Sequence, residues 1–248
     1  MPTAPAAPLP LTGERTLPDL PVENYWFRRH EAAYLALAPF VRGSLLVEAG
    51  CGEGYGADLL ARTAQRILAL DYDAASVAHV RARYPAHDVV RADLQRLPVA
   101  AGSVEVVANL QVIEHLHNQA GFLRECARVL RPAGTLLITT PNRLTFSPGR
   151  DTPLNPFHTR ELAAAELAAV LAPRFAVTRM LGLRHGRRLV RWERRHGSIV
   201  DAQLAAPPSR WSSELRREVE QVRAADFLVG PDDVNGSLDL VAVAVRRP

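Results

Sequence analysis

Short apolar runs alternate along the chain with longer segments that have helical periodicity. The runs occupy residues 45–50, 66–71, 88–92, 104–110 and 134–140. They are rich in Val, Leu and Ile, which is typical of strands buried on both faces of a parallel sheet. The pattern therefore predicts an α/β chain in which helices cover both faces of a parallel sheet.

A glycine-rich segment follows the first of these runs and carries the strongest functional signal. Glycines at positions 50, 52, 54 and 56 permit positive φ and let the backbone approach a ligand closely. The segment leads into a helix, whose free N–H groups would face that ligand. A dinucleotide-binding turn needs G-x-G-x-x-G, but Tyr55 stands where its third glycine would be. Asp71, which ends the second run, can bind a ribose whether the cofactor is a dinucleotide or another nucleotide-like molecule.

Polar or glycine residues follow the ends of several predicted strands. In a parallel sheet these carboxyl ends lie at one edge, and ligands bind in the crevice beside it. The sequence therefore predicts a single crevice formed by Gly50–Gly54, Asp71, Asp93, Gln111–His115 and Asn142.

The segment Glu48–Gly54 resembles motif I of the class I S-adenosylmethionine-dependent methyltransferases, whose pattern is acid-x-G-x-G-x-G. Further motifs of that family follow in order, at residues 89–98, 104–116 and 129–142. The chain is identified as a UbiE/UbiG-like member, similar to methyltransferases found with glycosyltransferase and polysaccharide genes in GC-rich bacteria. The resemblance implies a Rossmann-like fold and S-adenosyl-L-methionine as cofactor. It also implies a cofactor site made by Glu48, Gly50, Cys51, Gly52, Gly54, Asp71, Tyr72, Asp93, Leu94 and Gln111.

The resemblance also predicts how the rest of the chain is organised. The family's sheet has seven strands and ends in an antiparallel pair, for which residues 175–181 and 238–245 are suitable. The long connection between them predicts a helical cap insertion over 183–237, and residues 143–158 form a candidate lid loop. Residues 1–21 contain six prolines and are predicted to be a disordered tail. The methyltransferase domain then spans residues 22–248.

A helix is expected from about Glu23 to Ala38, before the first strand. Its neighbouring aromatic residues favour a packing role. Alternatively, Tyr25, Arg28 and His30 close over the cofactor, with Arg28 or Tyr25 meeting its carboxylate. One helix can serve both purposes.

Transfer of a methyl group to a hydroxyl needs a base that accepts the proton, and histidine is suited to this at neutral pH. His115, paired with Glu114 after the fourth strand, is one candidate. His158 is the other, and either histidine can instead brace its loop or the cofactor. The run Asn155–Glu161 resembles an "N-P-[FY]-H-x-R-E" pattern of methyltransferases encoded with glycosyltransferases and glycolipid pathways. The sequence therefore favours O-methylation of a small molecule or of a saccharide or glycolipid hydroxyl.

No metal site is predicted, because the chain lacks C-x-x-C and H-x-x-x-H spacing. Some sugar methyltransferases use a divalent cation near the acceptor, and Asp151, His158 or Glu114 could supply ligands for one. The sequence does not decide between these alternatives.

The chain has no lysine, and six of its arginines with two histidines lie between Arg184 and His196. This cluster is either a solvated helix face or a rim that attracts an anionic acceptor. No sequence-specific nucleic-acid module is present, so the sequence does not favour nucleic acid as a partner. Other acceptors (RNA, protein, quinone or lipid), a non-catalytic cofactor-binding scaffold and an oxidoreductase remain as alternatives. The absence of a long apolar run or signal pattern predicts a cytoplasmic protein, and oligomeric state stays open.

Overall fold

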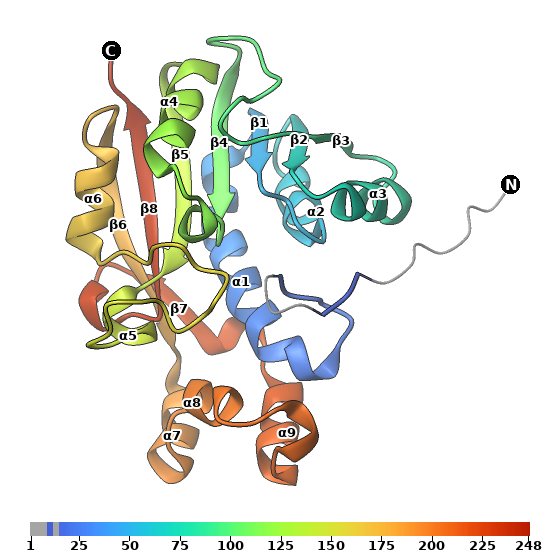
Figure 1. Cartoon of the computed structure of the whole chain (residues 1–248), viewed down its shortest axis with the longest axis vertical. Helices are drawn as coiled ribbons and strands as arrows, with labels where there is room; N and C mark the ends of the chain where they lie inside the picture. The colour runs from blue at the N-terminus through green and yellow to red at the C-terminus, as the bar shows by residue number, and fades with distance from the viewer. Residues whose placement is uncertain (1–8, 12–14) are drawn as a thin grey trace, which may run out of the picture.

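The computed structural model describes residues 9–11 and 15–248 and centres on one eight-stranded sheet (Figure 1). Its strand order is β3-β2-β1-β4-β5-β8-β6-β7. The strands are β1 (Leu45–Ala49), β2 (Arg66–Asp71), β3 (Asp88–Arg91), β4 (Val104–Leu110), β5 (Leu130–Pro141), β6 (Phe175–His185), β7 (Phe227–Gly230) and β8 (Asp239–Arg246).

The first five strands pair in parallel, and β8 pairs antiparallel with both β5 and β6. The predicted antiparallel end of the sheet is therefore confirmed. The expected number of strands, seven, is one too few, because β7 adds an edge strand to β6 through four antiparallel pairs, from Gly182 with Gly230 to His185 with Phe227. Only four residues form β7, too few for a recognisable alternation of apolar and polar positions.

Helices pack on both faces of the sheet and form two hydrophobic cores. One core joins α1, α2 and α3 through Leu37, Leu60 and Val80, and the other joins α4 and α6 through Phe122 and Leu167. Side-chain caps start several helices: Asp73 accepts the Ala75 N–H before α3, for example. The α-helices are α1 (Asn24–Leu37), α2 (Tyr55–Ala61), α3 (Ala74–Arg83), α4 (Gln119–Val129), α5 (Arg143–Phe146), α6 (Ala164–Leu171), α7 (Arg187–His196), α8 (Ile199–Leu204) and α9 (Ser213–Gln221).

The insertion predicted over residues 183–237 contains α7, α8 and α9, which lie together at one end of the molecule (Figure 1). It also contains β7, so it is only partly helical. Leu189 and Leu215 of the insertion join the same core as α1, which holds the insertion against the domain. Asn24, at the start of α1, strengthens this contact by donating to the carbonyls of Val219 and Val222 at 2.9 Å each.

The disordered tail predicted for residues 1–21 extends too far along the chain. Thr16 and Leu17 are buried, and Arg15 forms an ion pair of 2.8 Å with Asp73. Apolar burial and this ion pair attach the segment to α3, although its proline content indicated otherwise. Residues 1–8 and 12–14 of the predicted tail lie outside the described residues.

Within residues 9–11 and 15–248, none of the helices combines the length and apolar character that crossing a bilayer requires.

Candidate active site

A cavity of about 890 Å³ lies at the carboxyl ends of the parallel strands, where the sequence predicted a crevice. It gathers residues that lie more than a hundred positions apart in the sequence. The predicted site residues that line it are Gly50, Cys51, Gly52, Asp71, Tyr72, Asp93, Leu94, Gln111, Glu114, His115 and His158. Four other predicted residues, all in the described part of the chain, lie outside its lining: Tyr25, Arg28, Glu48 and Gly54.

The glycine-rich turn joins β1 to α2 and forms one wall of the cavity. Its first residue, Gly50, has φ of 91°, and a Cβ there would come within 2.6 Å of the Val112 side chain. A side chain at this position would therefore clash as well as strain the backbone. The N–H groups of Gly50 and Cys51 donate to the Leu70 carbonyl at 2.8 and 2.9 Å, which holds the turn against β2.

Asp71 lies at the end of β2 and organises the adjacent backbone. Its carboxylate accepts the Gly52 N–H at 2.8 Å and the Asp73 N–H at 2.9 Å. Burial raises the pKa of Asp71 above its usual value, although these two N–H donors oppose the rise. A carboxylate has about four lone-pair sites, so acceptor capacity is left for a ligand in the cavity.

Glu48, the acid of the glycine motif, is fully buried behind the turn. Tyr34 of α1 donates to its Oε1 at 2.7 Å. Gly56 permits this contact, since a Cβ there would lie 2.5 Å from Glu48 Oε1. Burial raises the pKa of Glu48 to about 8. In the structure this acid supports the turn from behind, away from the cavity surface.

Replacement of Glu48 by Gln should remove a pH-dependent loss of stability. Folding raises the pKa of Glu48. The contribution of Glu48 to the free energy of unfolding is therefore fully present below the pKa that it has in the unfolded chain, and it is lost as pH rises towards about 8. We expect the free energy of unfolding of Glu48→Gln to exceed that of the wild type by about 2 kcal/mol at about pH 9, and the gap to narrow towards about pH 5. Urea unfolding across this pH range measures the difference.

The exposed Glu220 provides the matched control, since Glu220→Gln should follow the wild-type pH curve. If the Glu48→Gln and wild-type curves remain parallel between these pH values, Glu48 does not titrate with a raised pKa.

Two of the three residues of α1 predicted to close over the cofactor, Tyr25 and Arg28, lie outside the cavity lining. Tyr25 is fully buried, and its hydroxyl is 2.7 Å from Nε2 of His185 in the insertion. Arg28 pairs with Glu31 at 2.7 Å, outside the cavity lining. Aromatic packing of Tyr25 with Trp26 and Phe227 accounts for its position. The helix therefore packs as the first interpretation expected, and of the residues named in the second interpretation His30 lines the cavity.

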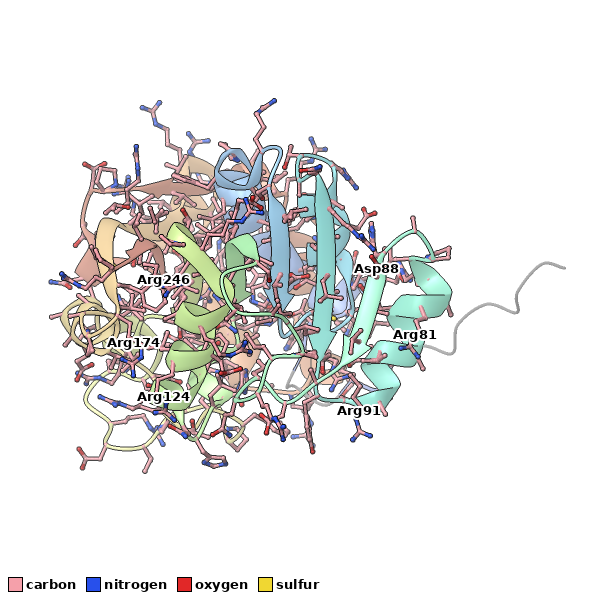
Figure 2. The ribbon with its side chains drawn as sticks, turned by 90° about the horizontal axis from the view of Figure 1, so that it is seen from above. Arg81, Asp88, Arg91, Arg124, Arg174 and Arg246 are labelled. Atoms are coloured by element: carbon pink, nitrogen blue, oxygen red, sulfur yellow. The ribbon has the colours of Figure 1, made fainter. Side chains whose placement is uncertain are left out.

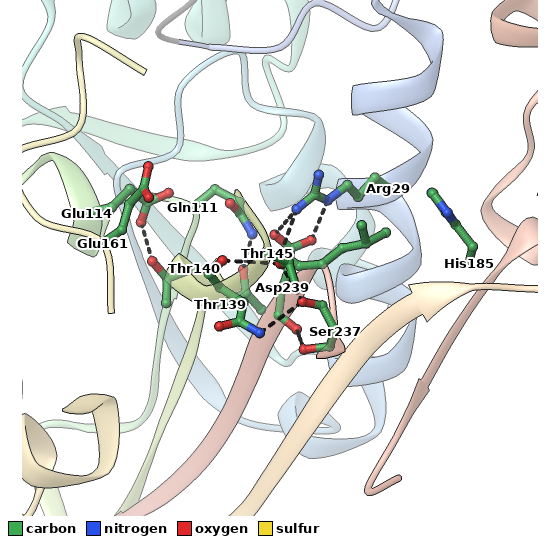
Figure 3. Close-up of polar contacts among 12 residues, drawn as sticks. Arg29, Gln111, Glu114, Thr139, Thr140, Thr145, Glu161, His185, Ser237 and Asp239 are labelled. Atoms are coloured by element: carbon green, nitrogen blue, oxygen red, sulfur yellow. Dashed lines mark hydrogen bonds and ion pairs between the residues drawn. The ribbon is translucent and has the colours of Figure 1, made fainter. Parts of the chain in front are cut away.

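His30, the third predicted residue, lines the cavity, and so do Trp26 and Arg29 of α1, which were not predicted. Their spacing of three and four residues places them on one helix face, a signal that was available in the sequence. Arg29 donates from Nε and Nη2 to the two carboxylate oxygens of Asp239, both at 2.6 Å (Figure 3). Its remaining nitrogen, Nη1, is buried without a partner among the described residues and points away from Asp239. A buried guanidinium nitrogen beside a cavity is a ready donor for an anionic ligand group.

Glu114, His115 and His158 meet at the cavity wall beyond the end of β4. His115 and Glu114 belong to a short 3-10 helix, Ile113–His115, and His158 comes from the loop after α5. The two imidazole rings lie edge to face with centroids 4.9 Å apart. Glu114 is 1% exposed, and its Oε2 accepts from the Thr140 hydroxyl at 3.0 Å. Burial raises the pKa of Glu114 to about 8.

Both histidines have a fixed partner on Nδ1. The Phe157 carbonyl is 2.9 Å from Nδ1 of His115, and Glu161 Oε1 is 2.6 Å from Nδ1 of His158. Glu161, 4% exposed, was not identified from the sequence, although its i,i+3 spacing from His158 was a usable signal. These bonds orient both rings at the cavity wall.

The candidate lid loop, residues 143–158, begins as α5 and continues along the cavity. Phe146, Leu154, Asn155, Pro156 and Phe157 line the cavity together with His158. Asn142 lies outside the cavity lining: its side-chain amide is buried and donates to the Ser237 carbonyl at 2.9 Å. The loop is therefore part of the site, and Asn142 anchors its start.

The arginines are distributed over the surface and do not gather at the cavity. None of Arg184–Arg195 is among the described residues that line it, and Arg188 is engaged with Glu218 and Asp226. Leu204 of α8 is the point where the insertion reaches the cavity wall. A second arginine group includes Arg124, Arg174 and Arg246 (Figure 2). Arg174 precedes β6 and Arg246 ends the antiparallel β8, so this group lies at the opposite edge of the sheet.

Known proteins are similar to this chain in sequence and in fold. A family model described as "Methyltransferase domain" matches residues 47–138. A protein of Mycobacterium tuberculosis named as a probable S-adenosylmethionine-dependent methyltransferase is 56% identical to this chain, over 98% of this chain and 92% of its own length. The chain belongs to the S-adenosylmethionine-dependent methyltransferases. The expected cofactor, S-adenosyl-L-methionine, is thereby confirmed for the enzyme.

More distant relatives extend these findings. The methyltransferase is 34% identical to a ubiquinone biosynthesis O-methyltransferase of Caulobacter vibrioides over 44% of each chain. The crystal structure of an S-adenosylmethionine-dependent methyltransferase from Mesorhizobium loti matches with a TM-score of 0.56 and 20% identity, over 88% of this chain and 98% of that one. This second likeness concerns the fold alone and confirms the Rossmann-like methyltransferase fold.

Proposed function

We propose that this methyltransferase methylates a hydroxyl oxygen of a small molecule or of a saccharide or glycolipid. The observation that carries the proposal is the meeting of Glu114, His115 and His158 at the wall of the cavity that Gly50 and Asp71 also line. A hydroxyl is a weak nucleophile until its proton is removed, and polar groups of this kind can promote that removal.

The residues at the cavity fit the cofactor. Asp71 retains acceptor capacity for two ribose hydroxyls, and the buried Nη1 of Arg29 is placed to bind a carboxylate. Tyr72, 72% exposed, lines the cavity near Asp71 and offers a ring face for an adenine. When bound, S-adenosylmethionine supplies an electrophilic methyl group. The chain holds the acceptor hydroxyl in line with the bond between sulfur and the methyl carbon.

Apolar side chains along the same cavity support an acceptor with an apolar part, as a glycolipid has. Leu154, Phe157 and Leu204 are 39%, 41% and 48% exposed, and all three line the cavity. Exposed apolar residues gathered at one site are typical of a binding surface. The relative that carries O-methyltransferase in its name supports oxygen as the methylated atom.

Incubation with S-adenosylmethionine and a panel of saccharides and glycolipids should yield S-adenosylhomocysteine and a methyl ether. We expect His158→Ala to lower kcat about 100-fold, because the group beside the acceptor hydroxyl is lost. Its Kd for S-adenosylhomocysteine should change by less than about 2-fold, since His158 acts on the acceptor. Mass spectrometry of the product and calorimetry of cofactor binding provide the two readouts.

The control is His87→Ala, because His87 pairs with Asp58 and lies outside the cavity lining. This variant should retain wild-type kcat. Methyl transfer to RNA, protein or a quinone with none to sugar hydroxyls would replace the proposed acceptor. Cofactor binding without turnover on any acceptor would favour the scaffold alternative.

A further inference from the structure

Glu114, His115 and His158 share a feature that proton transfer does not require. Each offers one ligand atom, and these atoms all lie within 4.8 Å of one another. Two of the residues follow β4 and the third belongs to a loop more than forty positions later, so the fold brings the set together. All three line the cavity, so the set lies where an acceptor can bind.

The contacts of the imidazole rings indicate which nitrogen of each ring carries the proton. A carbonyl oxygen only accepts, so the Phe157 carbonyl at 2.9 Å places the proton of His115 on Nδ1. The Glu161 carboxylate at 2.6 Å does the same for Nδ1 of His158. The Asn155 amide nitrogen is 3.2 Å from Nε2 of His158, as expected if that nitrogen accepts. Both Nε2 atoms therefore present lone pairs.

This arrangement is typical of metal-binding histidines. Such histidines donate their other ring N–H to a carboxylate or a backbone carbonyl, which fixes the ring and increases its basicity. Here Glu161 and the Phe157 carbonyl provide those two kinds of acceptor. Thr140 similarly orients the Glu114 carboxylate through its hydroxyl at 3.0 Å. A hydrogen-bonding partner thus supports every member of the set.

We propose that Glu114, His115 and His158 bind one divalent transition-metal ion at the acceptor end of the cavity. Two imidazoles and one carboxylate suit Mn²⁺, Fe²⁺, Co²⁺ or Zn²⁺ better than Mg²⁺ or Ca²⁺, which prefer oxygen ligands alone. Bond lengths of about 2.1 Å place ligand atoms on one ion about 3–4 Å apart, so separations of up to 4.8 Å have to shorten by about 1–2 Å when the ion binds. The Asn155 amide turns away from His158 when the ion binds.

The ion gives the three residues a role in the proposed function, on which this part of the inference rests. Its charge stabilises the negative charge that develops as the acceptor hydroxyl releases its proton to water. The hydroxyl oxygen then forms the new bond to the methyl carbon, and the electron pair of the broken sulfur–carbon bond stays on sulfur. The histidines hold the ion in this scheme and do not themselves accept the proton.

Titration of the chelator-treated protein with Mn²⁺, followed by electron paramagnetic resonance, tests the site without any turnover. We expect saturable one-to-one binding by the wild type. Glu114→Gln and His158→Gln should each weaken Mn²⁺ binding at least about 10-fold, because each removes one ligand. His117→Ala is the matched control, since His117 is exposed at the same cavity but lies outside the set, and it should bind as the wild type does.

Binding of S-adenosylhomocysteine by each variant shows that the fold and the cofactor site are intact. The proposal is overturned if the wild type binds neither Mn²⁺ nor Zn²⁺, or if both variants bind the ion like the wild type. Methyl transfer that survives complete chelation also overturns it and leaves the proposed function standing. Specific Mn²⁺ binding without methylation of any hydroxyl supports the metal site and contradicts the proposed function.

Discussion

Asp71→Ala should lower the affinity for S-adenosylhomocysteine by at least about 100-fold, the largest loss of cofactor binding that we expect from a single substitution. Two bonds from ribose hydroxyls to a carboxylate contribute about 1.5–3 kcal/mol each, and both are lost. The substitution also removes the acceptor of the Gly52 N–H, which is 2.8 Å from the carboxylate, so the glycine turn loses support. Isothermal titration calorimetry of the pure variant measures the change in Kd.

One further variant separates the loss of charge from the loss of the hydrogen-bond acceptor, and a second serves as the control. Asp71→Asn keeps an acceptor for one N–H group but loses the charge, so its affinity should lie between those of the wild type and Asp71→Ala. Asp88→Ala, which removes an exposed aspartate paired with Arg66 at the edge of the sheet (Figure 2), should bind like the wild type. An unchanged Kd for Asp71→Ala would show that the ribose does not bind at the end of β2.

Arg29→Met should reduce the free energy of unfolding by about 3–5 kcal/mol, the largest loss of stability expected from one substitution. Arg29 and Asp239 form a buried ion pair in which the side chains are 3% and 1% exposed. Removal of the arginine leaves the Asp239 carboxylate buried without its cation (Figure 3). Urea unfolding of wild type and variant at the same pH measures the difference.

The double variant Arg29→Met with Asp239→Asn should recover part of this loss, because no uncompensated charge then remains. Arg29→Lys keeps the charge but not the fork of donors, so it tests the contact with the cofactor carboxylate. Its affinity should fall for S-adenosylhomocysteine and stay unchanged for methylthioadenosine, which lacks the amino acid part. Equal losses for both ligands would contradict a role for Arg29 at the carboxylate.

The positions of Asp71, Asp93 and Gln111 beside one cavity could be predicted because they depend on local signals. A glycine turn follows a short apolar run, and each polar residue follows another such run. Once these runs are strands of one parallel sheet, their carboxyl ends lie at a common edge. Few other arrangements of the strands in a sheet are compatible with this order of strands and helices along the chain.

The face that α1 turns towards the cavity depended on distant contacts. The sequence pointed to Tyr25, Arg28 and His30, and of these His30 lines the cavity. Arg29, which was not predicted, faces the site because it pairs with Asp239, 210 positions away. Tyr25 points away from the cavity because its hydroxyl contacts His185 of the insertion, 160 positions away. Neighbouring positions on a helix point in different directions, and only packing against other elements decides which one is used.

The sequence by itself determined the parallel sheet, the glycine turn, the cofactor class and the gathering of polar residues at one edge, since all of these depend on short-range patterns and strand order. Only the tertiary structure decided the additional strand β7 and the burial of Thr16 and Leu17. It also decided the pairing of Glu161 with His158 and the position of His158 beside Glu114. These features depend on side-chain packing and on hydrogen bonds between segments far apart in the chain, which periodicity and spacing do not encode.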